Sequence, residues 1–393
     1  MNVLTSFDDC FSAETIADVL SVSKRNIESW AKNGKLVPIL DPATHKKPYK
    51  KEQLIQFPEF SAMFNSSWQE QEKTTPIREF SLVELFAGAG GLALGLEKAN
   101  FNHLFLNEKD SNCCTTLSSN RPSWKVIHED IHKINFSPYI NQVHLVTGGF
   151  PCQAFSIAGY QKGFADTRGT LFFDIEQIVE KHRPKVVFLE NVKNLVGHDN
   201  GNTFKVILES LKSHGYHVKY QVLNSCEYGN IPQNRERIYV VCFKDIEAYN
   251  KFSFPLPVQL DTSINDLLED EKTIDKKYFY TEKTPFFSQL VEEIKDAKTL
   301  YQWRRQYVRA NKSNMCPTLT ANMGTGGHNV PLILDDFGVR KLTPRECFNF
   351  QGFPDTFILP KQLASSALYK QAGNSVVAPV VKRIAEEIIK AIT

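Results

Sequence analysis

The chain has 393 residues, of which 42% are hydrophobic and 23% charged, and its formal net charge at pH 7 is +2. This composition is typical of a globular protein with two or three domains. No run of about 18 apolar residues is present and the first residues lack the basic start of a signal peptide, which argues against membrane insertion and export and favours a cytoplasmic protein. The eight cysteines are scattered without a Cys-x-x-Cys pair, so we expect reduced thiols and no metal site.

The first 60 residues have the pattern of a small helical domain. Apolar residues at helical spacing predict a helix over 13–20, with Ser12 as its N-cap. Ser23 is expected to cap a second helix, which ends at Asn33-Gly34. Two helices joined by so short a turn predict a helix-turn-helix.

A basic segment after the second helix predicts a wing over residues 36–49, followed by a short helix over 51–57. Between residues 23 and 51, eight basic residues face two acidic ones. The region resembles the winged helix-turn-helix domains of the MerR and excisionase type, whose second helix enters a major groove. The resemblance implies DNA contacts by Lys24 and Arg25. The alternative is a small helical bundle that packs on the main body of the protein.

Polar residues 61–77 are expected to form a linker, after which strands and helices alternate. Short apolar runs predict strands, and helical spacing predicts the helices between them. The expected strands span 81–86, 104–106, 125–127, 143–147, 184–189, 217–223 and 237–243, and the expected helices span 92–99, 171–181 and 203–214. This alternation over residues 78–244 predicts an α/β domain with a doubly wound, mostly parallel sheet.

A glycine-rich turn follows the first of these strands. Gly88, Gly90 and Ala93 have the spacing G-x-G-x-x-A, and Glu108 lies twenty residues beyond Gly88. Asp130 follows the third strand, so both acids are expected at the same carboxyl edge of the sheet. The pattern predicts an adenosine-containing cofactor, but it does not separate a nicotinamide dinucleotide from S-adenosylmethionine.

The stretch from Gly148 to Gln153 places Cys152 at the carboxyl end of a buried strand, where open α/β sheets hold their sites. Two glycines and Pro151 give a backbone path that is closed to most residues. Taken alone, a free cysteine is more often a small buried hydrophobe than a nucleophile. Glu190 follows the next strand in the same way.

The alternation is lost after residue 244. Prolines, polar residues and a glycine-rich run over 321–328 predict an irregular second domain over 245–362. The glycine run is equally consistent with a flexible surface loop and with contact to DNA. A final segment, 363–393, contains a helix over 376–392 that is expected to return to the sheet. Basic and aromatic residues interleave in the irregular domain and favour a polyanionic partner; they are Lys298, Tyr301, Trp303, Arg304, Arg305, Tyr307, Arg309 and Lys312.

The chain thus contains an ordered series of motifs. They are Phe86-Ala87-Gly88-Ala89-Gly90-Gly91, Glu108, Asp130, Gly149-Phe150-Pro151-Cys152-Gln153, Glu190-Asn191-Val192, Gln233-Asn234-Arg235-Glu236-Arg237, Arg340-Lys341-Leu342-Thr343-Pro344-Arg345-Glu346, Gln351-Gly352-Phe353-Pro354 and Gly373-Asn374-Ser375-Val376. This set closely resembles the C5-cytosine DNA methyltransferases, from about Leu82 to the C-terminus. The resemblance implies a Rossmann-like fold with a smaller target-recognition domain. Any one motif is modest evidence, whereas the ordered set is highly specific.

The resemblance implies methyl transfer from S-adenosyl-L-methionine to C5 of a flipped cytosine in a specific short DNA sequence. Carbon 5 of cytosine is a poor nucleophile, so a thiolate first adds to carbon 6, and Cys152 is implied for this step. Glu190 is implied to hydrogen-bond or protonate N3, and Arg237 to contact O2, with Arg235 in the same catalytic group. Without the family, Glu190 reads as a surface acid and the arginines as partners in surface ion pairs.

The resemblance places the cofactor on the glycine-rich turn, with Glu108 on the ribose hydroxyls and Asp130 at the adenine. The full implied set is Phe86, Gly88, Gly90, Glu108, Asp130, Ile131, Pro151, Leu171, Asn374 and Ser375. Family members often carry an aromatic or bulky apolar residue after the ribose-binding acid, whereas this chain has Lys109. The residue that covers the adenine face is therefore not assigned.

The target base lies inside a duplex, so the enzyme must flip it out. The loop over 153–168 is the expected lid, with Ser156 and Arg168 implied to contact DNA. Thr318-Leu319-Thr320 matches the threonine-leucine signature of the recognition domain. We expect double-stranded DNA as the partner, in a bacterial restriction–modification system whose cognate endonuclease acts on the same site without direct contact.

Three alternatives remain open. A tRNA cytosine-5 methyltransferase shares the Pro-Cys and Glu-Asn-Val motifs, although the N-terminal region and the long recognition segment argue against it. A DNA-binding regulator with an inactive catalytic domain would leave the intact Cys152 and Glu190 without a purpose. A nicotinamide dehydrogenase is allowed by the glycines but leaves Arg237 unexplained as well. Within the main hypothesis, the N-terminal domain either represses a promoter or strengthens binding at the methylation site.

Overall fold

The computed structural model describes residues 10–20, 22–40, 47–58, 60, 80–139, 141–150, 171–304, 306–311, 313–325 and 329–393. The chain divides into two compact units, Met1–Thr75 and Pro76–Thr393. The predicted linker, residues 61–77, lies outside the described residues. In the part of the chain that is described, no helix is both long and apolar enough to cross a membrane.

The N-terminal unit contains the two predicted helices. They are α1 (Ala13–Val19) and α2 (Lys24–Lys32). The backbone N–H of Thr15 donates to Oγ of Ser12 at 3.1 Å, which confirms the predicted N-cap. Ser23 occupies the N-cap position of α2, but its side chain makes no capping hydrogen bond and donates to Asn26 Oδ1 instead.

Residues 41–46 of the predicted wing lie outside the described residues, so the wing stays a prediction; its two arms meet where the backbone N–H of Ile39 donates to the carbonyl of Pro48 at 2.9 Å. Strand β2 (Tyr49–Lys50) pairs antiparallel with β1 (Cys10–Phe11), and residues 36–40 form no strand. Both backbone groups of Val37 bind the side-chain amide of Gln53, at 2.6 and 2.9 Å, so a strand partner is not needed there. The helix predicted over 51–57 is observed as the shorter α3 (Lys51–Leu54).

The larger unit is built on a seven-stranded sheet with the order β5-β4-β3-β6-β7-β10-β8. Its strands are β3 (Phe80–Leu85), β4 (Phe101–Glu108), β5 (Val126–His128), β6 (Leu145–Gly149), β7 (Val186–Val192), β8 (His217–Asn224) and β10 (Glu236–Phe243). Five neighbouring strands pair in parallel, in the order β5, β4, β3, β6 and β7. Strand β10 runs antiparallel to both β7 and β8. The predicted mostly parallel sheet is confirmed, and its parallel strands end along one edge.

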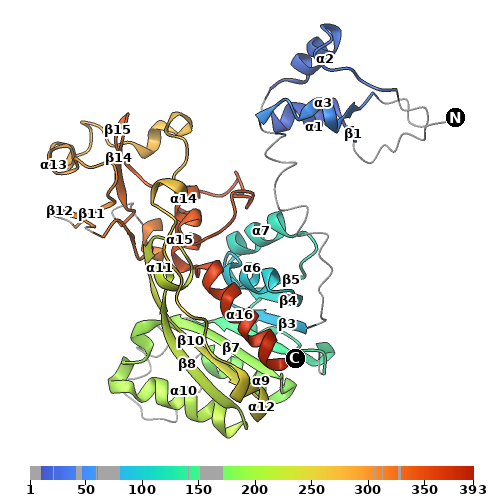
Figure 1. Cartoon of the computed structure of the whole chain (residues 1–393), viewed down its shortest axis with the longest axis vertical. Helices are drawn as coiled ribbons and strands as arrows, with labels where there is room; N and C mark the ends of the chain where they lie inside the picture. The colour runs from blue at the N-terminus through green and yellow to red at the C-terminus, as the bar shows by residue number, and fades with distance from the viewer. Residues whose placement is uncertain are drawn as a thin grey trace. The chain divides into compact units, whose positions relative to one another are not determined.

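Helices cover both faces of this sheet (Figure 1). On one face lie α6 (Gly91–Lys98), α12 (Ile246–Lys251) and α16 (Ala378–Ile392), whose apolar residues pack on Leu82, Val186 and Phe188. On the other face lie α9 (Leu171–His182) and α10 (Asn202–Ser213). The contact between α6 and α16 is close, because a Cβ at Gly95 would lie 2.5 Å from Cβ of Val381. The C-terminal segment therefore returns to the sheet, as predicted.

The region predicted to be irregular contains a small sheet of order β12-β11-β14-β15. Its strands are β11 (Tyr301–Trp303), β12 (Val308–Ala310), β14 (Leu332–Asp335) and β15 (Gly338–Lys341), and the nearby helices are α13 (Phe287–Glu293), α14 (Pro344–Asn349) and α15 (Ser365–Asn374). Strands of three or four residues are too short to give a clear alternation of apolar and polar residues, so the sequence did not predict them.

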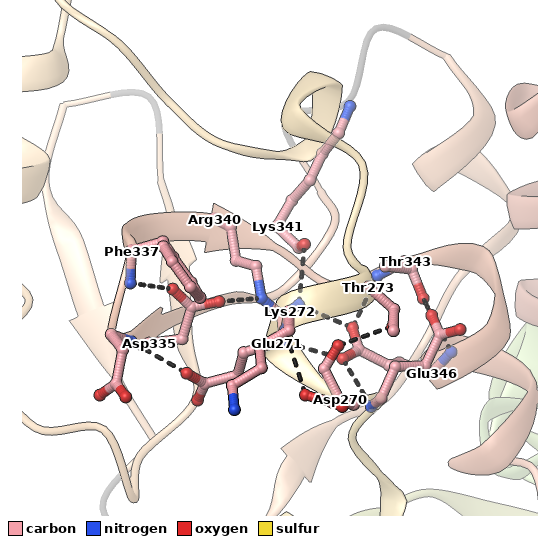
Figure 2. Close-up of polar contacts among 12 residues, drawn as sticks. Asp270, Glu271, Lys272, Thr273, Asp335, Phe337, Arg340, Lys341, Thr343 and Glu346 are labelled. Carbon is pink, nitrogen blue, oxygen red and sulfur yellow. Dashed lines mark hydrogen bonds and ion pairs between the residues drawn. The ribbon is translucent and has the colours of Figure 1, made fainter.

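A buried charge network holds the β14–β15 hairpin against α14 (Figure 2). The fully buried Arg340 donates through Nε to Asp335 at 2.6 Å and through both terminal nitrogens to Glu346 at 2.8 Å. Glu346 also accepts from the backbone N–H of Thr343 and closes the capping box of α14. Because each partner is satisfied, the three charges are tolerated inside the protein.

Candidate active site

The glycine-rich turn between β3 and α6 bends through left-handed backbone. The φ angles are +57° at Phe86, +55° at Gly88 and +89° at Gly90. Positive φ at a phenylalanine is a strained conformation of the kind that gathers at functional sites. A Cβ at Gly91 would lie 2.4 Å from Oγ of Ser375, so the turn packs directly on the segment after α15.

Glu108 is held beside this turn by three backbone donors. Its Oε2 accepts from the N–H of Gly88, and its Oε1 accepts from the N–H groups of Lys109 and Asp110, each at 2.7 Å. Charge-assisted bonds of this kind fix the carboxylate. The acid predicted to bind ribose therefore lies at the end of β4 in contact with the glycine turn.

Asp130 follows β5 at the same edge, and Lys109 lies over it. The Lys109 ammonium is 2.6 Å from Oδ2 of Asp130. This hydrogen bond and charge hold the pKa of Asp130 below its ordinary value. Ile131 is buried in the core beneath. The position after the acid predicted to bind ribose is thus occupied by a cation that pairs with the acid predicted to lie at the adenine.

Glu190 and Arg237 form a buried ion pair on adjacent strands. Glu190 lies within β7 rather than after it, in register with Gly149 of β6 and Tyr239 of β10. The Nε of Arg237 lies 3.1 Å from Oε1 of Glu190. Burial raises the pKa of Glu190, and the positive charges of Arg237 and Arg235 oppose this shift. A carboxyl group with a raised pKa in a site is suited to hold and donate a proton near neutral pH.

Asn191 fixes the chain that leads to the predicted nucleophile. Its side-chain amide donates to the carbonyl of Phe150 at 2.7 Å, and Phe150 packs against Phe172. The sequence contained Asn191 in a motif but gave it no role. Cys152, together with Pro151, Ser156 and Arg168, lies outside the described residues.

Arg235, which the sequence placed in the catalytic group with Arg237, lies buried among backbone carbonyls. Its side chain is 1% exposed and donates to the backbone carbonyls of Leu319, Gly373 and Ser375. A guanidinium with these acceptors holds the backbone, and a catalytic role for Arg235 stays a prediction. The sequence carried no signal for these contacts, because the acceptors are carbonyls far along the chain.

The threonine-leucine segment has one buried and two accessible side chains. Leu319 is 1% exposed within the core, so its predicted contact with DNA does not fit its burial. Thr318 donates through its hydroxyl to the carbonyl of Asn234 at 2.6 Å, and Thr320 is exposed. Of the remaining predicted residues, Leu171 is partly buried at the start of α9, and Asn374 is exposed at the end of α15.

The model of the C-5 cytosine-specific DNA methylases matches residues 80–390. The chain belongs to this family. It is a DNA cytosine-5 methyltransferase, and its methyl donor is S-adenosylmethionine. The match begins with β3 and excludes the N-terminal unit.

Two relatives give the extent of the similarity. The Type II methyltransferase M.Bsp6I of Bacillus sp. (strain RFL6) is 56% identical over 312 residues, which cover 79% of this chain and 98% of the relative. The Type II methyltransferase M.PspPI of Psychrobacter sp. (strain TA137) is 40% identical over 409 aligned residues, covering 98% of this chain and 96% of the relative. The second alignment covers 98% of this methyltransferase and therefore includes its N-terminal unit.

Solved structures support the fold. A DNMT2 mutant of Spodoptera frugiperda superposes with a TM-score of 0.63 at 16% identity, covering 79% of this chain and all of that one. A DNA modification methyltransferase encoded within an E. coli prophage gives a TM-score of 0.60 at 20% identity, covering 80% of this chain and 99% of that one. At these identities the likeness concerns the fold alone.

The residues of the glycine turn fit the methyl donor. Glu108 offers a fixed carboxylate to a ribose diol, and a Cβ at Gly88 would meet no atom of the described residues within 4 Å, so the turn is open there. Glu108 and Asp130 are hydrogen-bond acceptors, as the hydroxyl and amino groups of an adenosine require.

Proposed function

We propose that the methyltransferase is the modification enzyme of a restriction–modification system and that Cys152, Glu190 and Arg237 carry its chemistry. The buried pair of Glu190 with Arg237 is the observation that best supports this assignment. The proposal includes a cognate endonuclease that acts on the same DNA site, consistent with the Type II names of the relatives. Since the substrate is cellular DNA, the enzyme acts in the cytoplasm.

In the proposed mechanism the Cys152 thiolate adds to C6 of the flipped cytosine. Electron density moves toward N3, where the proton held by Glu190 stabilises it, while Arg237 donates to O2. S-adenosylmethionine supplies an electrophilic methyl group on a sulfonium. C5 would take the methyl group as the bond from sulfonium to methyl breaks and leaves a neutral thioether; a base then removes the C5 proton, and the bond between the cysteine sulfur and C6 breaks to release the thiolate.

The proposed cofactor site uses the residues that line the edge of the sheet. Glu108 accepts from the ribose hydroxyls, and Asp130 accepts from the adenine amino group. The proposed set is the one that the sequence predicted, namely Phe86, Gly88, Gly90, Glu108, Asp130, Ile131, Pro151, Leu171, Asn374 and Ser375. For Ile131, burial of the side chain leaves its backbone as the proposed contact.

The proposed DNA contacts come from the loop over 153–168 and from residues 245–362. Ser156 and Arg168 are proposed to hold DNA around the flipped base. In the second region, the β11–β12 hairpin exposes Tyr307 and Arg309. Leu319 is proposed to support its two threonine neighbours from the core, because its own side chain is buried.

The N-terminal unit is proposed to be a winged helix-turn-helix that binds DNA. Its α2 exposes Lys24 and Arg25, although Lys24 is engaged by Glu14 at 2.6 Å. Footprinting of the full chain on its own promoter separates the two roles. Protection that Arg25→Ala removes without altering methylation indicates repression, whereas weaker methylation with no promoter footprint indicates help in substrate binding.

The function is tested with purified protein, labelled S-adenosylmethionine and unmethylated plasmid, followed by bisulfite sequencing. We expect 5-methylcytosine at one short sequence, and we expect Cys152→Ala to abolish it. Transfer to tRNA instead of DNA would support the RNA methyltransferase. DNA binding without any transfer would support the inactive regulator.

A further inference from the structure

Arg235 lies at a junction of three chain segments that are distant in sequence. It sits between the two-residue strand β9 (Gln233–Asn234) and β10, two positions before Arg237. Strand β9 pairs in parallel with β13 (Cys316–Pro317), just before the threonine-leucine segment. A single side chain therefore stands where the strand of Arg237 meets both the recognition region and the segment after α15.

Each segment is held by the same guanidinium. Nη1 of Arg235 donates to the carbonyl of Leu319 at 2.6 Å. Nη2 donates to the carbonyl of Gly373 at 3.1 Å and to that of Ser375. These last two carbonyls belong to the C-terminal end of α15, where carbonyls lack helical partners and the helix dipole favours a cation. Arg235 thus caps α15 from outside the helix.

The packing around the junction leaves little room for adjustment. A Cβ at Gly373 would lie 2.2 Å from the backbone carbon of Thr320, so the two segments touch through their backbones. On its other side, Ser375 packs on Gly91 at the start of α6. A displacement of the segment 373–375 is therefore transmitted both to the glycine turn and to the threonine-leucine segment.

No carboxylate among the described residues lies within ion-pair distance of Arg235, in contrast to Arg340 with its two acids. A buried guanidinium is costly, and here the carbonyl dipoles compensate it together with the more distant carboxyl group of Glu190. A lysine has one nitrogen and cannot reproduce the fork that reaches both segments.

We infer that Arg235 is a positioning residue that sets the cofactor-side segment 373–375 and the threonine-leucine segment in register with Arg237. This inference rests on the proposed placement of S-adenosylmethionine against Asn374 and Ser375. It assigns to Arg235 a role in cofactor affinity and DNA affinity together, and none in the bond-making step.

The test compares Arg235→Lys and Arg235→Met with Arg340→Lys, a matched change at a buried arginine that does not contact the segment 373–375. Binding of S-adenosylmethionine is measured by calorimetry on the folded full chain, with thermal unfolding recorded for each variant. We expect the dissociation constant to rise by about 10- to 100-fold in Arg235→Lys, as the loss of charged hydrogen bonds predicts. We expect Arg340→Lys to lower the unfolding temperature and leave cofactor affinity unchanged.

Steady-state kinetics provides a second readout. The KM values for cofactor and DNA should both rise in Arg235→Lys. The kcat at saturating cofactor and DNA should stay within about threefold of the wild-type value, because the bound ligands hold the two segments in place. If Arg235→Met does not fold, Gly373→Ala disturbs the same junction through Thr320 and should give the same pattern. Unchanged cofactor affinity in folded Arg235→Lys and Gly373→Ala would overturn the inference.

Variants of the two proposed cofactor contacts show whether a negative result rejects the role of Arg235 or the proposed position of the cofactor. Ser375→Ala and Asn374→Ala should weaken cofactor binding if the placement is correct. Normal affinity in these two variants would reject the placement itself. Weakened affinity in them, together with normal affinity in Arg235→Lys, would reject only the role of Arg235.

Discussion

Gly149 faces Glu190 directly across the β6–β7 pair, and a Cβ at position 149 would lie 3.0 Å from Oε2 of the glutamate. The glycine therefore leaves the space that the carboxyl group occupies. Since Arg237 holds the other oxygen, the carboxyl cannot move aside without weakening the ion pair.

Gly149→Ala should reduce methyl transfer more than it reduces stability. Its methyl group displaces the Glu190 carboxyl by a few tenths of an ångström, and misplacement of a catalytic group by such an amount lowers kcat, here by about tenfold or more. The measurement is single-turnover transfer to DNA, with chemical denaturation as the control. A wild-type rate in the alanine variant would contradict this view of the site.

Glu190→Gln should lower kcat by about 100- to 10,000-fold, the contribution of a positioned acid. Burial raises the pKa of Glu190, so the fraction that carries a proton falls as pH rises through that raised value. The wild-type rate should therefore decline on the alkaline side through loss of this proton. Single-turnover rates of Glu190→Gln, measured across the same pH series, should not show this decline at alkaline pH.

Lys109→Met should make cofactor binding insensitive to salt. In the wild type the Lys109 ammonium competes for Asp130, and added salt screens an exposed pair. We expect wild-type affinity for S-adenosylmethionine to strengthen between low and moderate salt, and the methionine variant to bind more tightly with a flat salt dependence. Calorimetry over a salt series checks this, and a weaker affinity in the variant would instead show that the lysine assists the cofactor.

Arg340→Met should destabilise the larger unit by about 3–5 kcal/mol, the cost of leaving buried charges without a partner. The pKa of Glu346 is already raised by burial, and Arg340 opposes that shift. A raised folded-state pKa gives stability at acidic pH that is lost as pH rises through it, and removing Arg340 raises that pKa further. The loss should thus be larger at pH 8 than at pH 5.5 in urea unfolding. An equal loss at both values would exclude ionisation of Glu346 as its cause.

The sequence by itself determined the larger sheet and most of the residues around the site. Apolar runs predicted the strands to within a few residues, because buried parallel strands must be continuously hydrophobic. The glycine turn and Glu108 were found because they follow or end such a strand, and Glu190 because it lies near the end of one; strand ends meet at one edge. The N-cap at Ser12 was also readable, since a capping bond is local in sequence.

Tertiary structure alone decided what depends on partners far along the chain. The pairing of β1 with β2 and the binding of the Val37 backbone by Gln53 were not predicted, because each joins residues that are distant in the sequence. Arg235 and Arg237 look equivalent in the sequence, yet one binds three carbonyls and the other binds Glu190. The physical reason is that Arg235 lies between β9 and β10 whereas Arg237 lies on β10 beside β7, so each side chain meets partners that the fold brings from far along the chain.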